Sequence, residues 1–287
     1  MQNLFLHWSM KKLVLLFFAA FLLLINSCTN LDDTINVMTF NIRLDTENDG
    51  INKWDNRKEG IISLIKKNQV DILGIQEGLP NQIEYLSREL NNYSMIGEGR
   101  NGGNNGEFSA IFYNNNKLRL QLSQTLWLSE TPNTPSIGWD AALNRIVTMG
   151  VFTLKNSIKK LIVYNTHFDH IGELARENSI GVILNHIKTN KFLKDKLIVM
   201  GDFNAIPEEK PIKLINKVFS DSFDETIDKP HGTYSGFELD SRLEKRIDYI
   251  FIKNIEIIDY KHIRTKLQNN HWPSDHIPIM ISINKNL

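Results

Sequence analysis

Short apolar runs of β-forming residues recur along this chain and constrain its fold more than any other feature. The run LIVYNT at residues 161–166 is strongly β-forming, and a segment with helical periodicity follows it at residues 172–188. Strands outnumber helices, and strand–helix–strand units lie beside hairpin-like pairs of strands. This mixture predicts an α/β fold in which two packed sheets are covered by helices on the outside.

The expected elements follow from residue type and periodicity. We expect helices at residues 57–67, 80–90 and 172–188. We expect strands at residues 35–42, 71–76, 109–113, 118–128, 146–154, 161–166, 197–200, 246–252, 255–264 and 277–283.

The N-terminal segment has the features of an export signal. Met10, Lys11 and Lys12 form a charged start before an uninterrupted apolar run of 13 residues, which is shorter than the roughly 20 residues that span a bilayer. The only cysteine, Cys28, then ends the sequence LINSC, which resembles a bacterial lipoprotein cleavage box. We therefore expect Cys28 to be lipid-modified. An ordinary signal, or an uncleaved anchor with an incidental cysteine, is the alternative.

This interpretation divides the chain into three parts. Residues 1–27 are predicted to be a signal peptide with translation starting at Met10, residues 28–34 a polar tether, and residues 35–287 one domain. The protein is expected to be a monomer held on a membrane of the bacterial cell envelope by its N-terminal lipid. The side of the envelope that it faces is left open.

The charge balance gives no support for a nonspecific polyanion-binding surface. The chain has 33 basic and 33 acidic residues, and loss of the signal peptide leaves 31 basic against 33 acidic ones. A global basic field is therefore excluded, whereas a local basic groove is not. Nucleic acid is weakened as a substrate without being excluded.

Acids, amides and histidines cluster at the ends of the predicted strands, where α/β folds place their active sites. Each alone is weak evidence, because Gly, Asp and Asn also form turns. Carboxylates and amides together suit Mg²⁺ or Mn²⁺, and histidines near them can move protons or stabilise phosphoryl oxygens. The residues concerned are Asn41, Glu77, His167, Asp202, Asn204, Asp248, Asp275 and His276.

Six segments in a fixed order resemble the endonuclease/exonuclease/phosphatase superfamily, which includes pancreatic-type deoxyribonucleases. The segments are VMTFNIR, DILGIQE, VYNTHFDH, IVMGDFNAIP, RIDYIFI and SDHIPIMISI, and they cover residues 37–283. The resemblance implies a four-layer α/β sandwich with two central mixed sheets. It also implies metal-dependent hydrolysis of phosphate esters.

The same resemblance suggests roles for the residues around the metal. Glu77 looks like the principal metal ligand, with Asn41 and Asp275 close by. Asp202 resembles the residue that orients or deprotonates the attacking water. Asn204 resembles the amide that holds the phosphate or the nucleophile.

The histidines are expected to act beside that metal. His276 resembles the histidine that pairs with Asp248, and His167 the second histidine, which would bind phosphoryl oxygens or protonate the leaving group. A two-histidine acid–base mechanism and a metal-hydroxide mechanism both fit this set. Glu107 lies where some relatives place a carboxylate against the first histidine, and Arg145 where they carry a phosphate-binding arginine.

Five further residues have two readings each. Arg57 and Trp54 open the first predicted helix, where we favour a solvated charge over a contact with an anion. Asp169, His170 and Arg176 match a pattern common to one branch of the family. They are expected either to line the substrate side or to cap the following helix.

The substrate is left open by the sequence. A small phosphoester or sugar phosphate, a nucleic acid and a lipid headgroup all fit a divalent-metal phosphodiesterase or phosphatase, and a secreted scavenging nuclease is the main alternative enzyme. A noncatalytic envelope binding protein on the same fold is the alternative of another class. The loops expected to select the substrate are residues 44–56, 97–107, 129–144 and 222–244.

Overall fold

The computed structural model describes residues 34–155, 157–223, 226–227 and 229–285. The predicted signal peptide, Cys28 and all of the tether except Thr34 lie outside the described residues. Within the described ranges, no helix has the length and apolar character that crossing a membrane requires.

The first sheet has six strands in the order β11-β12-β1-β2-β4-β3. Its strands β1 and β2 run parallel, and Asn41 pairs with Gln76 at their last positions. Because parallel strands end at the same edge, Asn41 and the next residue after β2, Glu77, reach one edge of the sheet. The strands are β1 (Thr34–Asn41), β2 (Ile72–Gln76), β3 (Tyr93–Ile96), β4 (Ile111–Asn114), β11 (Ile257–His262) and β12 (Ile279–Asn284).

The second sheet also has six strands, in the order β5-β6-β7-β8-β10-β9. His167 pairs with Asp202 across the parallel strands β7 and β8, and Asp202 pairs with Asp248 across the antiparallel strands β8 and β10. His167, Asp202 and Asp248 therefore lie side by side on three neighbouring strands. The strands are β5 (Leu118–Trp127), β6 (Ile146–Leu154), β7 (Lys160–His167), β8 (Lys196–Asp202), β9 (Ser220–Asp221) and β10 (Asp248–Lys253).

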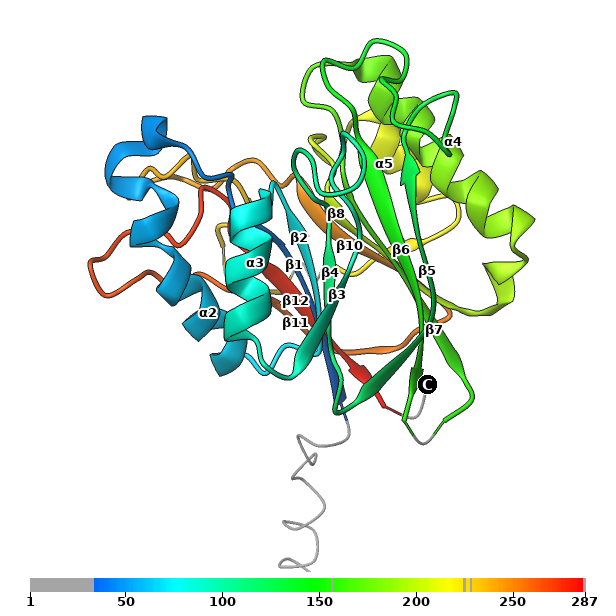
Figure 1. Ribbon diagram of the computed structural model, residues 1–287, viewed down its shortest axis with the longest axis horizontal. Helices are drawn as coiled ribbons and strands as arrows, with labels where there is room; N and C mark the ends of the chain where they lie inside the picture. The colour runs from blue at the N-terminus through cyan, green and yellow to red at the C-terminus, as the bar shows by residue number, and fades with distance from the viewer. Residues whose placement is uncertain (1–33, 156, 224–225, 228, 286–287) are drawn as a thin grey trace, which may run out of the picture. The chain divides into compact units, whose positions relative to one another are not determined.

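Helices cover the outer face of each sheet, α2 and α3 on the first and α4 and α5 on the second (Figure 1). The helices are α2 (Lys58–Lys67), α3 (Pro80–Glu89), α4 (Glu173–Thr189) and α5 (Lys210–Ile215), with short 3-10 helices η2 (Glu47–Asn52), η3 (Trp54–Asn56) and η4 (Phe192–Lys194). The expected four-layer α/β sandwich is confirmed.

Alternation along the strands separates most apolar residues into three large cores, and a small fourth cluster forms around Trp272. In β1, Val37 packs between the two sheets, whereas the next residue, Met38, packs under α2 and α3. Both side chains are fully buried, and each such burial contributes about 1.5–3 kcal/mol. A strand with two apolar faces fits only between two buried layers, which is why β1 lies at the centre of the sandwich.

A glycine lets β8 approach β7 closely beside His167 and Asp202. Gly201 has a φ of +143°, and a Cβ atom there would lie 2.0 Å from the backbone oxygen of Thr166. Any larger residue would push apart the strand ends that carry His167 and Asp202.

Besides the three short 3-10 helices, two strands and one α-helix were not expected from the sequence. They are β3, β9 and α5, which have four, two and six residues. Segments this short contain too little periodicity to be recognised. Asp248 was expected inside its strand, but it is the first residue of β10 and so lies at the sheet edge with the other active residues.

Candidate active site

A pocket of about 590 Å³ lies where the predicted catalytic residues of the two sheets meet. Of the predicted site residues, Asn41 and Asp248 do not line the pocket, although both bond to residues that do. The predicted residues in its wall are Glu77, Glu107, Arg145, His167, Asp202, Asn204, Asp275 and His276.

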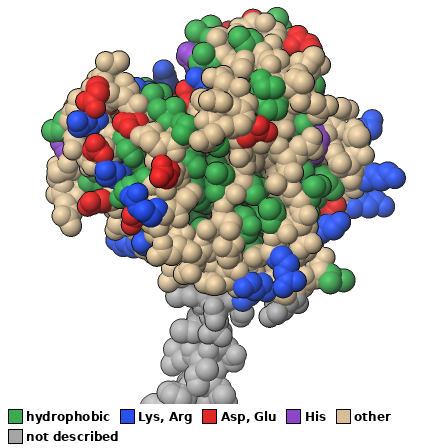
Figure 2. Space-filling view, in the orientation of Figure 1, with side chains coloured by type: hydrophobic (Ala, Val, Ile, Leu, Met, Phe, Trp, Pro, Cys, Tyr) green, Lys and Arg blue, Asp and Glu red, His purple; other side chains and the backbone are tan. Residues whose placement is uncertain are grey.

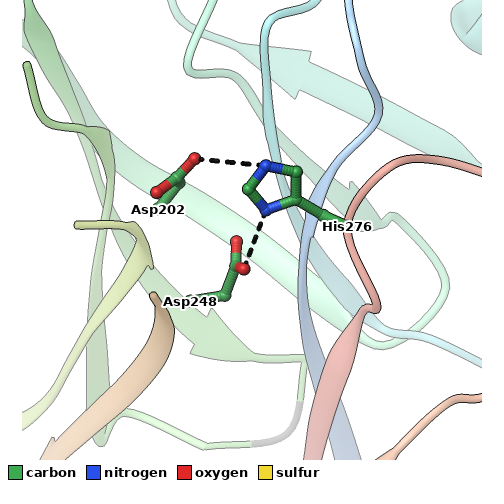
Figure 3. Close-up of side chains that lie close together, drawn as sticks. All are labelled: Asp202, Asp248 and His276. Atoms are coloured by element: carbon green, nitrogen blue, oxygen red, sulfur yellow. Dashed lines mark hydrogen bonds and ion pairs between the residues drawn. The ribbon is translucent and has the colours of Figure 1, made fainter. Parts of the chain in front are cut away.

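His276 is held between two buried carboxylates (Figure 3). Its Nδ1 atom lies 2.9 Å from Oδ2 of Asp248, and its Nε2 atom lies 3.7 Å from Oδ2 of Asp202. Burial alone would lower the pKa of His276, but the two carboxylates outweigh it and raise that pKa well above its usual value. His276 is therefore an imidazolium that Asp248 orients.

Asp202 is the buried carboxylate at the centre of the site. Its Oδ1 accepts the backbone N–H of Asn204 at 2.9 Å, and its Oδ2 accepts the amide of Asn41 at 3.0 Å. Burial raises the pKa of Asp202 to about 7, an effect that His276 opposes and Asp248 reinforces. A carboxyl group with this pKa can exchange a proton near neutrality.

His167 is neutral, in contrast to His276. Its Nε2 atom accepts the Nδ2 amide of Asn204 at 3.1 Å, so that nitrogen carries a lone pair and the proton is on Nδ1. Burial, followed by the charges of Arg145 and His276, lowers the pKa of His167 well below its usual value. Asn204 is fixed by a second bond to the Phe168 carbonyl and by a left-handed backbone with a φ of 46°.

A set of oxygen atoms lies at the end of the first sheet. The Nδ2 atom of Asn41 donates to Oε1 of Glu77 at 3.1 Å as well as to Asp202, so one amide links the two carboxylates. Glu77 has a φ of 63°, an unfavourable backbone for a long side chain that is typical of functional positions. Asp275 is held nearby because Ser235 donates to its carbonyl at 2.9 Å.

These oxygen atoms fit a divalent cation. Glu77 and Asp275 both line the pocket, whereas Asn41 turns its Nδ2 atom toward Glu77 and its Oδ1 atom accepts the backbone N–H of Arg43, so Asn41 holds the carboxylates and does not itself offer a ligand there. Such hard donors, with water completing the shell, are what Mg²⁺ or Mn²⁺ requires. Asp202, Asp248 and His276 also lie close enough together to surround an ion. An imidazolium has no lone pair for a metal, however, so the set around Glu77 is the better candidate.

Arg145 is also fixed in the pocket wall. Its Nε donates to Asp169 at 3.2 Å, and its Nη2 donates to Nδ1 of His170 at 2.9 Å. Asp169 also accepts the backbone N–H groups of Ile171 and Gly172 just before α4. His170 lines the pocket, as expected for the substrate side, whereas the first N–H groups of α4 are capped by Asp140 and not by Asp169, which holds Arg145 and the turn before the helix. Arg176 is buried in α4 and donates to the Asp169 carbonyl.

The contact expected for Glu107 is wrong. Its carboxylate lies 2.7 Å from Nη2 of Arg100, and no hydrogen bond to His167 occurs among the described residues. Burial raises the pKa of Glu107, which Arg100 partly offsets. Arg100 lies in the Gly- and Asn-rich loop before Glu107, where no periodic pattern predicts which side chains form pairs.

The solvated reading of Arg57 is also wrong. Arg57 is only 1% exposed, and its Nη1 donates to the carbonyls of Ile42 and Pro273 at 2.8 Å each. The side chain therefore ties the end of β1 to the segment that precedes Asp275. The neighbouring Trp54 is buried in the core under α2.

Sequence reasoning missed other pocket residues. Arg43 lines the pocket and lies two positions after Asn41 in the FNIR segment. Its position as a charged residue just after a strand could have identified it as a site residue. Arg100 and Lys245 lie in long loops, where no such signal exists. Tyr234, in the loop of residues 222–244, also lines the pocket, and its ring packs edge-on against His276.

Comparisons with known proteins agree with this geometry. The model of the Endonuclease/Exonuclease/phosphatase family matches residues 38–276. An endonuclease/exonuclease/phosphatase from Bacteroides vulgatus is 32% identical, with a TM-score of 0.82 over 88% of this chain and 98% of its own. A mannosyl-6-phosphatase from Bacteroides thetaiotaomicron is 30% identical, with a TM-score of 0.80 over 87% of this chain and 99% of its own.

Two further proteins also match. An uncharacterised protein of Acanthamoeba polyphaga mimivirus is 31% identical over 256 residues, which are 82% of this chain and 94% of the relative. The human Nocturnin catalytic domain, at 20% identity and a TM-score of 0.70, shares the fold. The matched segment includes every predicted catalytic and metal-binding residue from Asn41 to His276. The chain thus belongs to the endonuclease/exonuclease/phosphatase family and is a phosphoester hydrolase.

Proposed function

We propose that this protein hydrolyses small phosphate monoesters, such as sugar phosphates, with Mg²⁺ or Mn²⁺. The observation that carries this proposal is the distribution of charge in the pocket. Three arginines line it, and each is held by a carboxylate of its own. The pairs are Arg43 with Asp49, Arg100 with Glu107, and Arg145 with Asp169. Fixed guanidinium groups around a pocket of about 590 Å³ suit a compact anion.

The residues divide the work of hydrolysis. Asp202 accepts a proton as water attacks phosphorus, and its pKa of about 7 suits that step. The His276 imidazolium and Arg145 stabilise the charge that develops on the phosphoryl oxygens. The ester P–O bond breaks, the leaving alkoxide takes a proton from solvent, and Asp202 returns to solvent the proton that it accepted, so that the alcohol and orthophosphate remain. A cation held by Glu77 and Asp275 would supply Lewis-acid stabilisation of the same oxygens.

The relatives support a small substrate. The Bacteroides thetaiotaomicron mannosyl-6-phosphatase matches over nearly its whole length at 30% identity. A nuclease would instead use a continuous basic surface that tracks the phosphate backbone. On the face shown in Figure 2, acidic and basic side chains are interspersed over α2 and α3. The net charge of the chain is zero, which also disfavours a nonspecific nuclease.

We further propose that the enzyme works at the bacterial cell envelope, anchored through a lipid on Cys28. The support is the sequence alone, in which the single cysteine follows a charged and then apolar segment. A polar tether of residues 28–34 would then join the lipid to the catalytic domain.

Steady-state kinetics on a substrate panel test the proposed function. Hexose 6-phosphates, bis-p-nitrophenyl phosphate, plasmid DNA, RNA and sphingomyelin are each offered with Mg²⁺ or Mn²⁺. The proposal expects the highest kcat/KM for a sugar monophosphate. Faster cleavage of DNA or RNA would support the nuclease alternative. Metal-loaded, folded protein that turns over no phosphoester would support a noncatalytic binding protein.

A further inference from the structure

The backbone of Arg43 is fixed at the end of β1. Its N–H donates to Oδ1 of Asn41 at 3.0 Å, and its carbonyl accepts the side-chain amide of Gln82 at 2.9 Å. The residue has a φ of 59°, in the left-handed region that non-glycine residues seldom occupy. This backbone, maintained by bonds on both sides, is the kind of local strain that is retained at functional sites.

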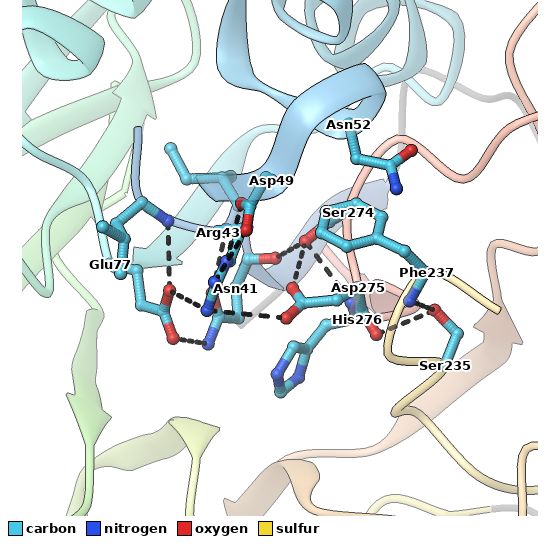
Figure 4. A network of polar contacts seen from close by, with 12 residues as sticks. Asn41, Arg43, Asp49, Asn52, Glu77, Ser235, Phe237, Ser274, Asp275 and His276 are labelled. Atoms are coloured by element: carbon cyan, nitrogen blue, oxygen red, sulfur yellow. Dashed lines mark hydrogen bonds and ion pairs between the residues drawn. The ribbon is translucent and has the colours of Figure 1, made fainter. Parts of the chain in front are cut away.

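The guanidinium group of Arg43 is fixed as well. Its Nε and Nη2 atoms donate to the two oxygens of Asp49, each at 2.9 Å (Figure 4). The side chain of Asp49 is 9% exposed and that of Arg43 30%, so the carboxylate of this bidentate pair is largely shielded from water. The Nη1 atom is left with no hydrogen bond among the described residues, although the side chain lines the pocket.

The free edge of Arg43 is directed at the candidate metal ligands. Its Nη1 atom lies 3.9 Å from Oε2 of Glu77 and also 3.9 Å from Oδ2 of Asp275. These separations are too long for hydrogen bonds. They leave a donor beside the two carboxylates, where a phosphoryl group bound to a cation on those carboxylates would present an oxygen.

Phosphate monoesters and diesters differ at this point of the substrate. A monoester near neutral pH has three terminal oxygens and nearly two negative charges, because its second pKa is about 6. In a diester one of those oxygens is esterified, the charge is one, and that position offers a weaker acceptor. A rigid arginine donor therefore distinguishes the two classes, since hydrogen bonds between charged groups are the stronger ones.

We propose that Arg43 determines the preference for monoesters by donating its Nη1 N–H to the third terminal oxygen of the phosphate, while Asp49 positions it. This inference rests on the proposed phosphomonoesterase function. It assigns to Arg43 a role separate from those of Arg145, which precedes β6 of the second sheet, and His276, which precedes β12 of the first; all three line the pocket.

Calorimetric binding tests the proposal without turnover. Orthophosphate and dimethyl phosphate are titrated into the Mg²⁺-loaded protein at pH 8, with Arg43→Met, Arg43→Lys and Asp49→Asn as variants. Arg88→Met is the control, because Arg88 is exposed on α3 and does not line the pocket. Thermal unfolding and a separate Mg²⁺ titration accompany each variant.

Arg43→Met is expected to weaken orthophosphate binding by about 10- to 100-fold, as loss of a charged hydrogen bond does. Dimethyl phosphate binding is expected to change less than about threefold. Arg43→Lys and Asp49→Asn are expected to fall between Arg43→Met and wild type. Mg²⁺ binding is expected to be unchanged or tighter, because a cation beside Glu77 and Asp275 has been removed.

If Arg43→Met bound orthophosphate and dimethyl phosphate more weakly by the same factor, the proposal would be overturned. Weaker Mg²⁺ binding in Arg43→Lys would also overturn it, because Arg43 would then act by supporting the metal ligands. A protein that binds orthophosphate through Arg43 but hydrolyses no monoester would refute the proposed function alone. The two failures are therefore distinguishable.

Discussion

The Nδ1 atom of His276 lies 2.9 Å from Oδ2 of Asp248, whose other oxygen is buried and has no hydrogen-bond partner among the described residues. A buried carboxylate with a single partner is stabilised almost entirely by that partner. Asp248 and His276 therefore form one functional unit, although they come from β10 and from the segment before β12.

A double-mutant cycle tests this unit. Asp248→Asn and His276→Ala are each expected to lower kcat/KM by about 10²- to 10⁴-fold, because both remove the oriented imidazolium. The double variant is expected to lose little more than the worse single one, since residues that act together are non-additive. Steady-state kinetics measures all four proteins. Losses that multiply would show that the two residues act independently.

Removal of the candidate metal ligand Glu77 is expected to abolish most turnover while the fold persists. Its carboxylate links to Asn41 at 3.1 Å and to the backbone N–H of Leu44 at 3.0 Å, and it lies beyond the end of β2. Glu77→Ala is therefore expected to reduce activity by at least about 10³-fold. Its Mg²⁺ affinity, measured by calorimetry, is expected to fall too.

Glu89→Gln, which changes a partly exposed acid on α3, is the matched control for Glu77→Ala. Full activity of the wild type in excess chelator, with elemental analysis showing that no metal is present, would contradict the metal assignment.

The stability of the domain is expected to fall with acidification because of His262. Burial, helped by the charges of Arg264 and Arg246, lowers the pKa of His262 to about 3 from its usual 6.5. A depressed folded-state pKa means that the unfolded chain binds the proton first. Stability is therefore complete above pH 6.5 and declines as pH falls toward 3, by at most about 1.4 kcal/mol per pH unit.

His262→Gln, which retains an acceptor for the Tyr260 hydroxyl, removes this titration. Urea unfolding at pH 7.5 and pH 5 measures the effect, and wild type is expected to lose more stability between the two than the variant. An identical loss in both proteins would assign the acid sensitivity to other groups.

The residues that the sequence predicted share a physical signature. Glu77, Asp202 and His276 are polar residues that interrupt apolar strand patterns at sheet edges, and packing alone does not account for them. The mixture of strand–helix–strand units and hairpin-like strands likewise predicted the two packed sheets. Each of these inferences depends on local pattern, which sequence displays directly.

The partners of charged side chains were less predictable. Glu107 pairs with Arg100 through a loop fold, and Arg57 is buried against Pro273, which lies 216 positions away. Such contacts depend on how distant loops pack together, and no periodicity encodes them. Short elements such as α5 were missed for a related reason, because tertiary packing rather than local propensity stabilises them.

The location of the protein is tested at Cys28. If Cys28 is the lipid-modified first residue, intact-mass analysis of the native protein will give a chain that starts there and carries acyl mass. Cys28→Ser is expected to release soluble or unprocessed protein from the envelope fraction, because several acyl chains on one residue hold a protein on a membrane. A mature N-terminus elsewhere, or an unmodified Cys28, would contradict the lipid anchor and leave the catalytic account unchanged.

Hydrolysis of a hexose 6-phosphate in ¹⁸O-labelled water tests the central claim most directly. The account predicts that the wild type with Mg²⁺ releases orthophosphate containing one ¹⁸O atom, while the C6 hydroxyl of the sugar carries none, because water attacks phosphorus. The rate is predicted to collapse in Asp202→Asn, which cannot accept the proton from water. The account would be contradicted by ¹⁸O in the C6 hydroxyl of the sugar. It would also be contradicted if metal-loaded protein that cuts DNA released no orthophosphate from any sugar phosphate.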